Sequence, residues 1–113
     1  MPDAAPLPGY LIAQIRVRDL ADYIERYARH VVPLLAAVGG EVLVASPAAE
    51  CREGEWPANW TVVIRFPSLQ AARDFYAAPA YAPYRALRLD ELTDGSALVI
   101  AEGFDPAALG AAG

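Results

Sequence analysis

The chain of 113 residues contains no lysine, one cysteine and one histidine. The single cysteine, Cys51, excludes an internal disulfide and every metal or redox motif that needs two cysteines, and it favours a reducing, cytoplasmic location. No stretch is apolar for long enough to span a membrane, so no membrane association is predicted. Glycine-rich phosphate loops, dinucleotide-binding fingerprints and zinc motifs are also absent, so the sequence predicts neither a cofactor nor a metal.

Positive charge is also scarce. The nine basic residues, all of them arginine, are outnumbered by 14 acidic residues, and the net charge is -5. A protein that binds nucleic acid needs a concentrated basic face, because its affinity comes from displacing counterions from phosphates. The charge balance therefore excludes nucleic acid as a predicted partner.

The residues that are present are typical of one globular domain. Hydrophobic residues make up 56% of the chain, which is too high for a disordered protein, and a chain of this length forms a single core. We expect the domain to cover residues 9–104. A flexible N-terminal arm over residues 1–8 and a flexible, alanine-rich and glycine-rich tail over residues 105–113 are predicted to flank it.

Apolar spacing predicts four strands and two helical regions. The strands are expected at residues 10–17, 41–45, 60–66 and 96–102. The first helix begins after Asp19, a good N-cap, and ends at Gly39. A proline inside it predicts a kink or a tightened turn over residues 29–33. Ser68 is predicted to cap a second helix, which a proline interrupts and which resumes over residues 80–89.

This order, β-α-β-β-α-β, is that of the ferredoxin-like fold. It predicts an α+β domain in which a four-stranded antiparallel sheet carries two helices on one face. The other face is left uncovered, and Tyr10, Ile12 and Leu43 are candidates to lie on it. We expect a second copy of the chain to cover this apolar face, giving a homodimer.

The chain resembles a known family in a set of spaced residues. They are Asp19, Tyr23, Tyr27, Pro33 and Gly39-Gly40; then Glu53-Gly54-Glu55-Trp56-Pro57, Val63-Ile64, Phe66-Pro67-Ser68 and Ala71-Ala72; then Tyr76, Pro79, Tyr81 and Arg88. On this pattern the chain is identified as a member of the domain-of-unknown-function family numbered 1330, over residues 9–103. That family is similar to the dimeric α+β barrel superfamily, which includes cofactor-free monooxygenases, isomerases, haem-handling enzymes and stress proteins. The resemblance implies the fold and the dimer but no particular reaction.

The chain departs from the family pattern at three places. Arg65 stands where glutamate is usual, Ala45-Ser46 replace an arginine-glycine pair, and Leu89-Asp90 replace small residues. A pocket shared with the family is therefore expected to carry a different charge here.

His30 is the residue to which acid–base chemistry at neutral pH first points, because it is the only histidine. Helical spacing places it on the same flank as Tyr23 and Tyr27, so His30 and Tyr27 are the candidate catalytic residues. The alternatives are a solvated histidine beside arginines and a lone axial ligand to haem.

Two arginines on neighbouring strands, Arg16 and Arg65, are candidates to clamp a substrate carboxylate, with Gln14 on the same face of the first strand. The structural alternative pairs Arg65 with Glu41 across the sheet.

Aromatic residues with polar tips suggest a pocket for a flat organic molecule. Trp60 and Tyr76 are candidates to line it, and Arg88, which matches the family motif, is a further candidate. The alternative is that these side chains serve packing in the core and the dimer. The predicted function is therefore a small-molecule-binding protein, and as its finer form a cofactor-free isomerase, cyclase or monooxygenase that acts on an aromatic or carboxylate-bearing metabolite. A non-catalytic dimeric module is the alternative.

Overall fold

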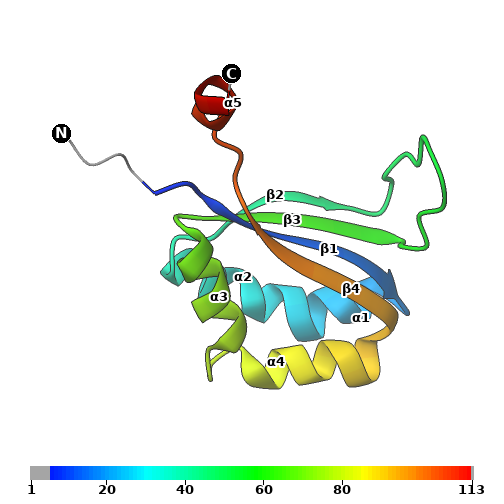
Figure 1. Cartoon of the computed structure of the whole chain (residues 1–113). Helices are drawn as coiled ribbons and strands as arrows, with labels where there is room; N and C mark the ends of the chain where they lie inside the picture. The colour runs from blue at the N-terminus through cyan, green and yellow to red at the C-terminus, as the bar shows by residue number, and fades with distance from the viewer. Residues whose placement is uncertain (1–5, 113) are drawn as a thin grey trace.

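Four strands form one antiparallel sheet in the computed structural model, which describes residues 6–112 (Figure 1). The strands are β1 (Gly9–Val17), β2 (Glu41–Ser46), β3 (Trp60–Phe66) and β4 (Thr93–Glu102). Their order across the sheet is β2-β3-β1-β4, and every neighbouring pair is antiparallel. The two helical regions connect β1 to β2 and β3 to β4, so the predicted ferredoxin-like α+β fold is confirmed.

The first helical region is α1 (Leu20–Tyr23), η1 (Ile24–Ala28) and α2 (Arg29–Ala37) in direct succession. Asp19 caps it as predicted, since its carboxylate accepts a hydrogen bond of 2.9 Å from the backbone N–H of Asp22. The helix ends before Gly39, whose φ of 79° is in the left-handed region that glycine tolerates.

A π turn interrupts this helix, and its position differs from the predicted irregularity. The wide turn is η1, before Arg29, whereas the sequence predicted a kink or a tightened turn over residues 29–33. Tyr23, Tyr27, Val31 and Leu35 are all buried at a spacing of four residues. Because four residues of a regular α-helix overshoot a full turn by about 40°, the wider turn helps to keep all four on the sheet side.

The second helical region is α3 (Leu69–Ala77), α4 (Ala82–Leu87) and η2 (Arg88–Leu92). Ser68 caps α3 as predicted, its hydroxyl accepting from the N–H of Ala71 at 3.0 Å. The helix extends three residues beyond its predicted end, and β4 begins at once with Thr93. The expected turn at residues 94–95 therefore lies inside β4, beside an irregularity in its register with β1.

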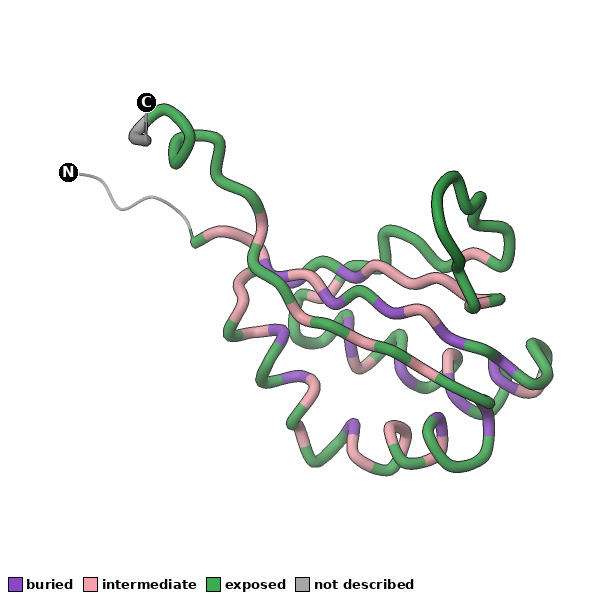
Figure 2. The backbone as a smooth tube through the Cα atoms, turned by 45° about the vertical axis from the view of Figure 1, so that its right-hand side comes forward, coloured by how far each residue is buried: buried purple, intermediate pink, exposed green. Residues whose placement is uncertain are grey.

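The helices α1 to α4 cover one face of the sheet and leave the other open (Figure 1). On β1, Leu11, Ala13, Ile15 and Val17 are buried against the helices, and the residues between them face the other way. The loop between β2 and β3 is largely exposed, as the green tube in Figure 2 shows. The core therefore lies between one sheet face and two helical regions, and any cavity in it is bounded by both.

The chain after β4 includes a short exposed helix, α5 (Ala107–Ala112), in the segment for which a flexible tail was predicted. It lies on the opposite side of the sheet from α1 to α4 (Figure 1). Most of the predicted N-terminal arm, residues 1–5, lies outside the described residues. Pro8 joins the fold, because its carbonyl accepts a hydrogen bond of 2.7 Å from the N–H of Gly103.

Candidate functional site

A cavity of about 90 Å³ lies between the sheet and the helices. Its walls come from β1, β2, β3, β4 and both helical regions, and most of the lining side chains are aliphatic. The exceptions share either an aromatic ring or a charge: Tyr23, Tyr27, Trp60, Phe75, Tyr81 and Arg88. Polar groups are few in this cavity, so each of them is informative about what it can hold.

Arg88 is the cationic side chain among the residues that line the cavity. The residue is only 1% exposed, although a free arginine is strongly hydrated. One terminal nitrogen, Nη1, donates a hydrogen bond to the hydroxyl of Ser96 on β4, and Nε is buried without a hydrogen-bond partner. Within residues 6–112 no carboxylate forms a salt bridge with it. The guanidinium is therefore a buried cation that the described protein groups leave without a counter-charge.

Three tyrosines lie around this cation. The hydroxyls of Tyr27 and Tyr81 are 2.6 Å apart and share one hydrogen bond, and the ring of Tyr23 packs 4.9 Å from that of Tyr27. Burial raises the pKa of Tyr23 and of Tyr27 well above the usual range, although the Arg88 charge opposes the rise. These phenols are therefore neutral at physiological pH and available as hydrogen-bond donors.

The charge state of Arg88 follows from the same neighbours. Burial lowers the pKa of the Arg88 guanidinium and the hydroxyl of Tyr81 opposes that fall, and the group stays protonated at physiological pH because the pKa of an arginine begins far above it. The site thus combines one permanent cation with neutral donors in apolar surroundings. That combination is suited to an anionic oxygen.

Two of the polar lining residues, Tyr27 and Arg88, lie in π turns. Tyr27 belongs to η1, and Arg88 is the first residue of η2. Such turns are rare and occur frequently at functional sites, because the additional residue redirects the side chains that follow. Here they hold the cation of the site and one of its phenols.

The lining offers no group suited to proton abstraction or metal binding. None of the described residues that line the cavity is histidine, aspartate, glutamate or cysteine. Nowhere in the described part of the chain do three or more such residues gather in a way that could hold a metal ion. The lining is therefore equipped to bind and to stabilise an anion.

Comparison with known proteins gives the family. Residues 8–104 match the model of a family described as a domain of unknown function, DUF1330. The chain belongs to this family. No curated protein matches the chain. Within residues 6–112, no helix has the length and apolar character that crossing a bilayer would require.

Solved structures support the fold assignment. A protein of unknown function from Rhodopseudomonas palustris is 17% identical, with a TM-score of 0.69 over 88% of this chain and 85% of that one. A candidate antibiotic biosynthesis monooxygenase from Nitrosomonas europaea is 13% identical, with a TM-score of 0.58 over 94% and 98% of the two chains. At these identities the comparison shows that the DUF1330 chain shares its fold with both proteins. It does not show that the chain shares their activities.

Of the sequence-predicted site residues, Tyr27, Trp60 and Arg88 line the cavity. Tyr76 does not, because its ring packs against Tyr81 at 6.0 Å and beneath the Arg85 guanidinium at 5.1 Å. The sequence therefore identified three of the polar or aromatic lining residues by type and motif.

His30 lies elsewhere. It is exposed on α2, and its ring stacks on that of Tyr84 at 5.7 Å with an angle of 15° between the ring planes. Tyr27, three residues earlier, faces the sheet, so the two candidate catalytic residues are not brought together.

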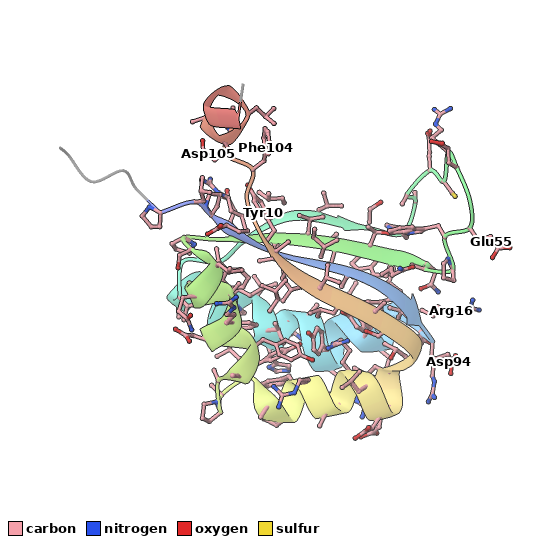
Figure 3. All side chains as sticks on the ribbon, viewed as in Figure 1. Tyr10, Arg16, Glu55, Asp94, Phe104 and Asp105 are labelled. Atoms are coloured by element: carbon pink, nitrogen blue, oxygen red, sulfur yellow. The ribbon has the colours of Figure 1, made fainter. Side chains whose placement is uncertain are left out.

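The open face of the sheet carries Gln14, Arg16 and Arg65, on the opposite side from the cavity. Arg16 donates to the carbonyl of Pro57 at 3.3 Å, and Gln14 has a buried Oε1 without a partner. Figure 3 shows Tyr10 and Arg16 toward opposite ends of β1.

The predicted arginine clamp is wrong in its geometry. Arg65 is paired with Tyr10, near the start of β1, whereas Arg16 is near its end. The reason is that β1 and β3 are antiparallel, so two residues that are both late in their strands lie far apart. Arg65 is instead opposite Glu41 in the register of β2 and β3, as the structural alternative expected.

Two lining residues, Tyr23 and Tyr81, were not among the predicted site residues. Tyr23 lies on the apolar stripe of the first helix, where a tyrosine is ordinarily a core residue. Tyr81 reaches Tyr27 across 54 positions of sequence. The available signal was their place in the family motif beside Arg88.

Proposed function

We propose that this chain is a small-molecule-binding protein whose ligand carries one anionic oxygen group, a carboxylate or an enolate, bound by Arg88. The observation that supports this proposal is the buried guanidinium, whose hydrogen-bond partners are the neutral hydroxyls of Ser96 and Tyr81 and which has no carboxylate beside it among the described residues. An uncompensated buried charge is among the costliest features of a protein interior. A ligand anion removes that cost when it binds.

The surrounding tyrosines make the same ligand favourable. One hydroxyl of the pair Tyr27 and Tyr81 donates its proton to the other oxygen. The accepting hydroxyl therefore keeps its own proton to donate elsewhere. A carboxylate accepts from a guanidinium at two positions and from a phenol at another, so both of its oxygens have partners. The aliphatic lining and Trp60 then contact the apolar remainder of the ligand.

The enzymatic form of the proposal is a cofactor-free reaction that passes through an enolate. The donors that bind a carboxylate also stabilise an enolate oxygen, and the fold shared with a candidate monooxygenase supports this form. The proton transfer assigned to His30 lacks geometric support, because the ring of His30 stacks on Tyr84 at the surface. The geometry therefore favours binding over catalysis. The alternative of a non-catalytic protein is compatible with such binding.

The binding proposal is tested by calorimetric titration of hexanoate and of its neutral amide. We expect hexanoate to bind and the amide to bind at least about tenfold more weakly, because a hydrogen bond to a charged group is worth about 1.5–3 kcal/mol. Arg88→Met should remove the preference for the anion. The matched control is Arg73→Met, an exposed position on α3, which should leave both affinities within about twofold. Equal affinities in the parent and in Arg88→Met would contradict the proposal.

We further propose a homodimer formed through the open face of the sheet. On that face a row of aliphatic side chains crosses all four strands, since Val44 pairs with Val63, Val63 with Ile12, and Ile12 with Val99. Three of the four are exposed at the surface: Ile12, Val44 and Val99. A continuous apolar row of this kind is typical of a surface that another protein covers.

Light scattering tests the dimer. The parent is expected at the mass of two chains, and Val99→Asp should give one chain, because it places a carboxylate in the apolar row at its β4 end. Val38→Asp, at a similarly exposed position at the end of α2, is the control and should remain dimeric. A parent protein at the mass of one chain would refute the dimer.

A further inference from the structure

The cation and two of the phenols form a chain of hydrogen bonds. The guanidinium of Arg88 donates to the hydroxyl of Tyr81, whose oxygen is 2.6 Å from that of Tyr27. Both tyrosines are buried, and their rings contact one another at 6.3 Å between centroids. The ring of Tyr27 also packs 4.9 Å from that of Tyr23, and these contacts hold its hydroxyl in place. The three groups therefore follow one another in the order Arg88, Tyr81, Tyr27.

The cation at one end gives this chain a direction. A hydroxyl hydrogen carries partial positive charge, so beside a guanidinium it is most stable when it points away. If Tyr81 donates to Tyr27, both O–H bonds point away from Arg88, whereas the reverse direction points the hydrogen of Tyr27 toward the cation. A hydroxyl that accepts from a charged donor also becomes a better donor itself. The chain therefore runs from Arg88 through Tyr81 to Tyr27, and the proton left over belongs to Tyr27.

The remaining proton of Tyr27 has few acceptors within reach. Among the described lining residues the only side-chain acceptors are tyrosine oxygens, because the other side chains are hydrocarbon, indole or guanidinium. The hydrogen bond with Tyr81 is the one that the Tyr27 hydroxyl forms within residues 6–112. At the other end of the chain, Nε of Arg88 is buried without a partner. Both ends of the chain thus offer a donor, and both end residues line the cavity.

We infer that Tyr27 is the phenol that donates to the ligand, and that Tyr81 is a positioning residue that fixes the direction of this donation. One oxygen of the carboxylate accepts from Arg88 and the other from Tyr27, so the ligand closes the chain into a ring. This inference rests on the proposed function, since it takes Arg88 as the anion-binding group. It adds the source of specificity: the site presents donors alone, so it accepts an ionised carboxylate and rejects a neutral amide, whose NH₂ group would face a donor.

The test compares acetate with acetamide, titrated into the full chain at constant ionic strength and followed by NMR chemical shifts. The two probes have the same shape and the same number of non-hydrogen atoms, so the comparison concerns charge and hydrogen bonding rather than size. In either orientation acetamide turns its NH₂ group toward one of the two donors. The parent should therefore bind acetate at least about tenfold more tightly than acetamide.

Tyr27→Phe removes the donating hydroxyl and keeps the ring. The affinity for acetate should fall at least about tenfold, because a hydrogen bond to a charged group is lost. The affinity for acetamide should stay within about threefold or rise, since the donor that faces its NH₂ group is gone. Tyr84→Phe is the matched control: it makes the same change at a residue outside the lining, stacked on His30, and should leave both affinities within about twofold.

Tyr81→Phe tests the positioning role. Tyr27 keeps its hydroxyl in this variant but loses the partner that fixes its direction, so the hydroxyl can turn and accept from an NH₂ group. Acetate should bind within about fivefold of the parent, and acetamide at least about threefold more tightly. A loss of packing alone would instead weaken both probes to the same extent. In the parent labelled with ¹³C at the tyrosine Cζ atoms, acetate should shift the signal of Tyr27 more than that of Tyr81.

The outcomes separate this inference from the function beneath it. If Tyr81→Phe weakens acetate binding at least as much as Tyr27→Phe, or the Cζ signal of Tyr81 shifts more in the parent, the chain runs the other way and the inference is wrong. If both variants bind acetate within about twofold of the parent while Arg88→Met does not, the phenols do not contact the ligand and the anion site stands. If Arg88→Met keeps the preference for acetate, the proposed function fails and the inference fails with it. Should Tyr27→Phe not fold, the Cζ shifts of the parent decide the direction alone.

Discussion

The central test of the role of Arg88 is its effect on stability without any ligand. In Arg88→Met a long apolar side chain of similar length replaces the buried guanidinium. If the cation serves the fold, removing it should destabilise the protein. If it serves a ligand, the ligand-free protein bears an uncompensated cost, and removing the cation should relieve it.

The structure indicates the sign of the change. Removing a guanidinium from water costs several kcal/mol, and its hydrogen bonds to the hydroxyls of Ser96 and Tyr81 return about 1.5–3 kcal/mol each. The buried Nε recovers none of its lost hydration. Methionine at the same place gains about 1.5–3 kcal/mol from burial. We therefore expect Arg88→Met to be about 1–3 kcal/mol more stable than the parent, which corresponds to a rise in Tm of at least about 4 °C.

Urea denaturation at pH 7, followed by the fluorescence of the tryptophans, measures this difference in ligand-free protein. Arg73→Met is the control for loss of one exposed positive charge and should lie within about 0.5 kcal/mol of the parent. Addition of hexanoate should stabilise the parent and leave Arg88→Met unaffected. A ligand-free Arg88→Met protein that is destabilised by more than about 2 kcal/mol would refute the reasoning, since the fold itself would then require the guanidinium.

Two further predictions follow from the same geometry. Because burial raises the pKa of Tyr23 and Tyr27 in the folded protein, the stability that their neutral forms contribute is present at lower pH and is lost as pH rises above about 10, by about 1.4 kcal/mol per pH unit for each tyrosine; urea denaturation between pH 9 and 12 measures the slope, and an equally steep slope in Tyr23→Phe/Tyr27→Phe would contradict it. His30→Ala should change the affinity for hexanoate by less than about twofold, because His30 is exposed and stacked on Tyr84; a tenfold loss in the same titration would return His30 to the site.

Much of the fold was predictable from local sequence. The caps at Asp19 and Ser68 and the alternation along β1 act over a few residues, and the structure confirms both caps and the buried face of β1. The order of the elements then leaves few topologies that keep crossovers right-handed. Element ends were less predictable, because the π turn η2 continues the second helix to Leu92, three residues beyond its predicted end.

The separation of the two predicted arginines was also implicit in the sequence. Antiparallel pairing of β1 and β3 follows from the predicted topology, and it places Arg16 and Arg65 toward opposite ends of the sheet. The pair with Glu41 came from the same reasoning and is correct in register. The clamp was wrong because residue types were compared by their place in each strand, without the direction of the strands.

The site itself depends on contacts that no local pattern records. Sequence alone determined that Arg88 and Tyr27 belong to helical regions, that the chain forms one α+β domain and that it has one histidine and one cysteine for chemistry to draw on. Tertiary structure decided that Arg88 is buried beside Ser96 with no carboxylate of the described chain near it, that Tyr81 meets Tyr27, and that His30 faces solvent. The physical reason is that helical periodicity determines only which residues share one face of a helix. The charge balance of a buried group depends on every element packed around it. In addition, two π turns changed the direction in which those faces point.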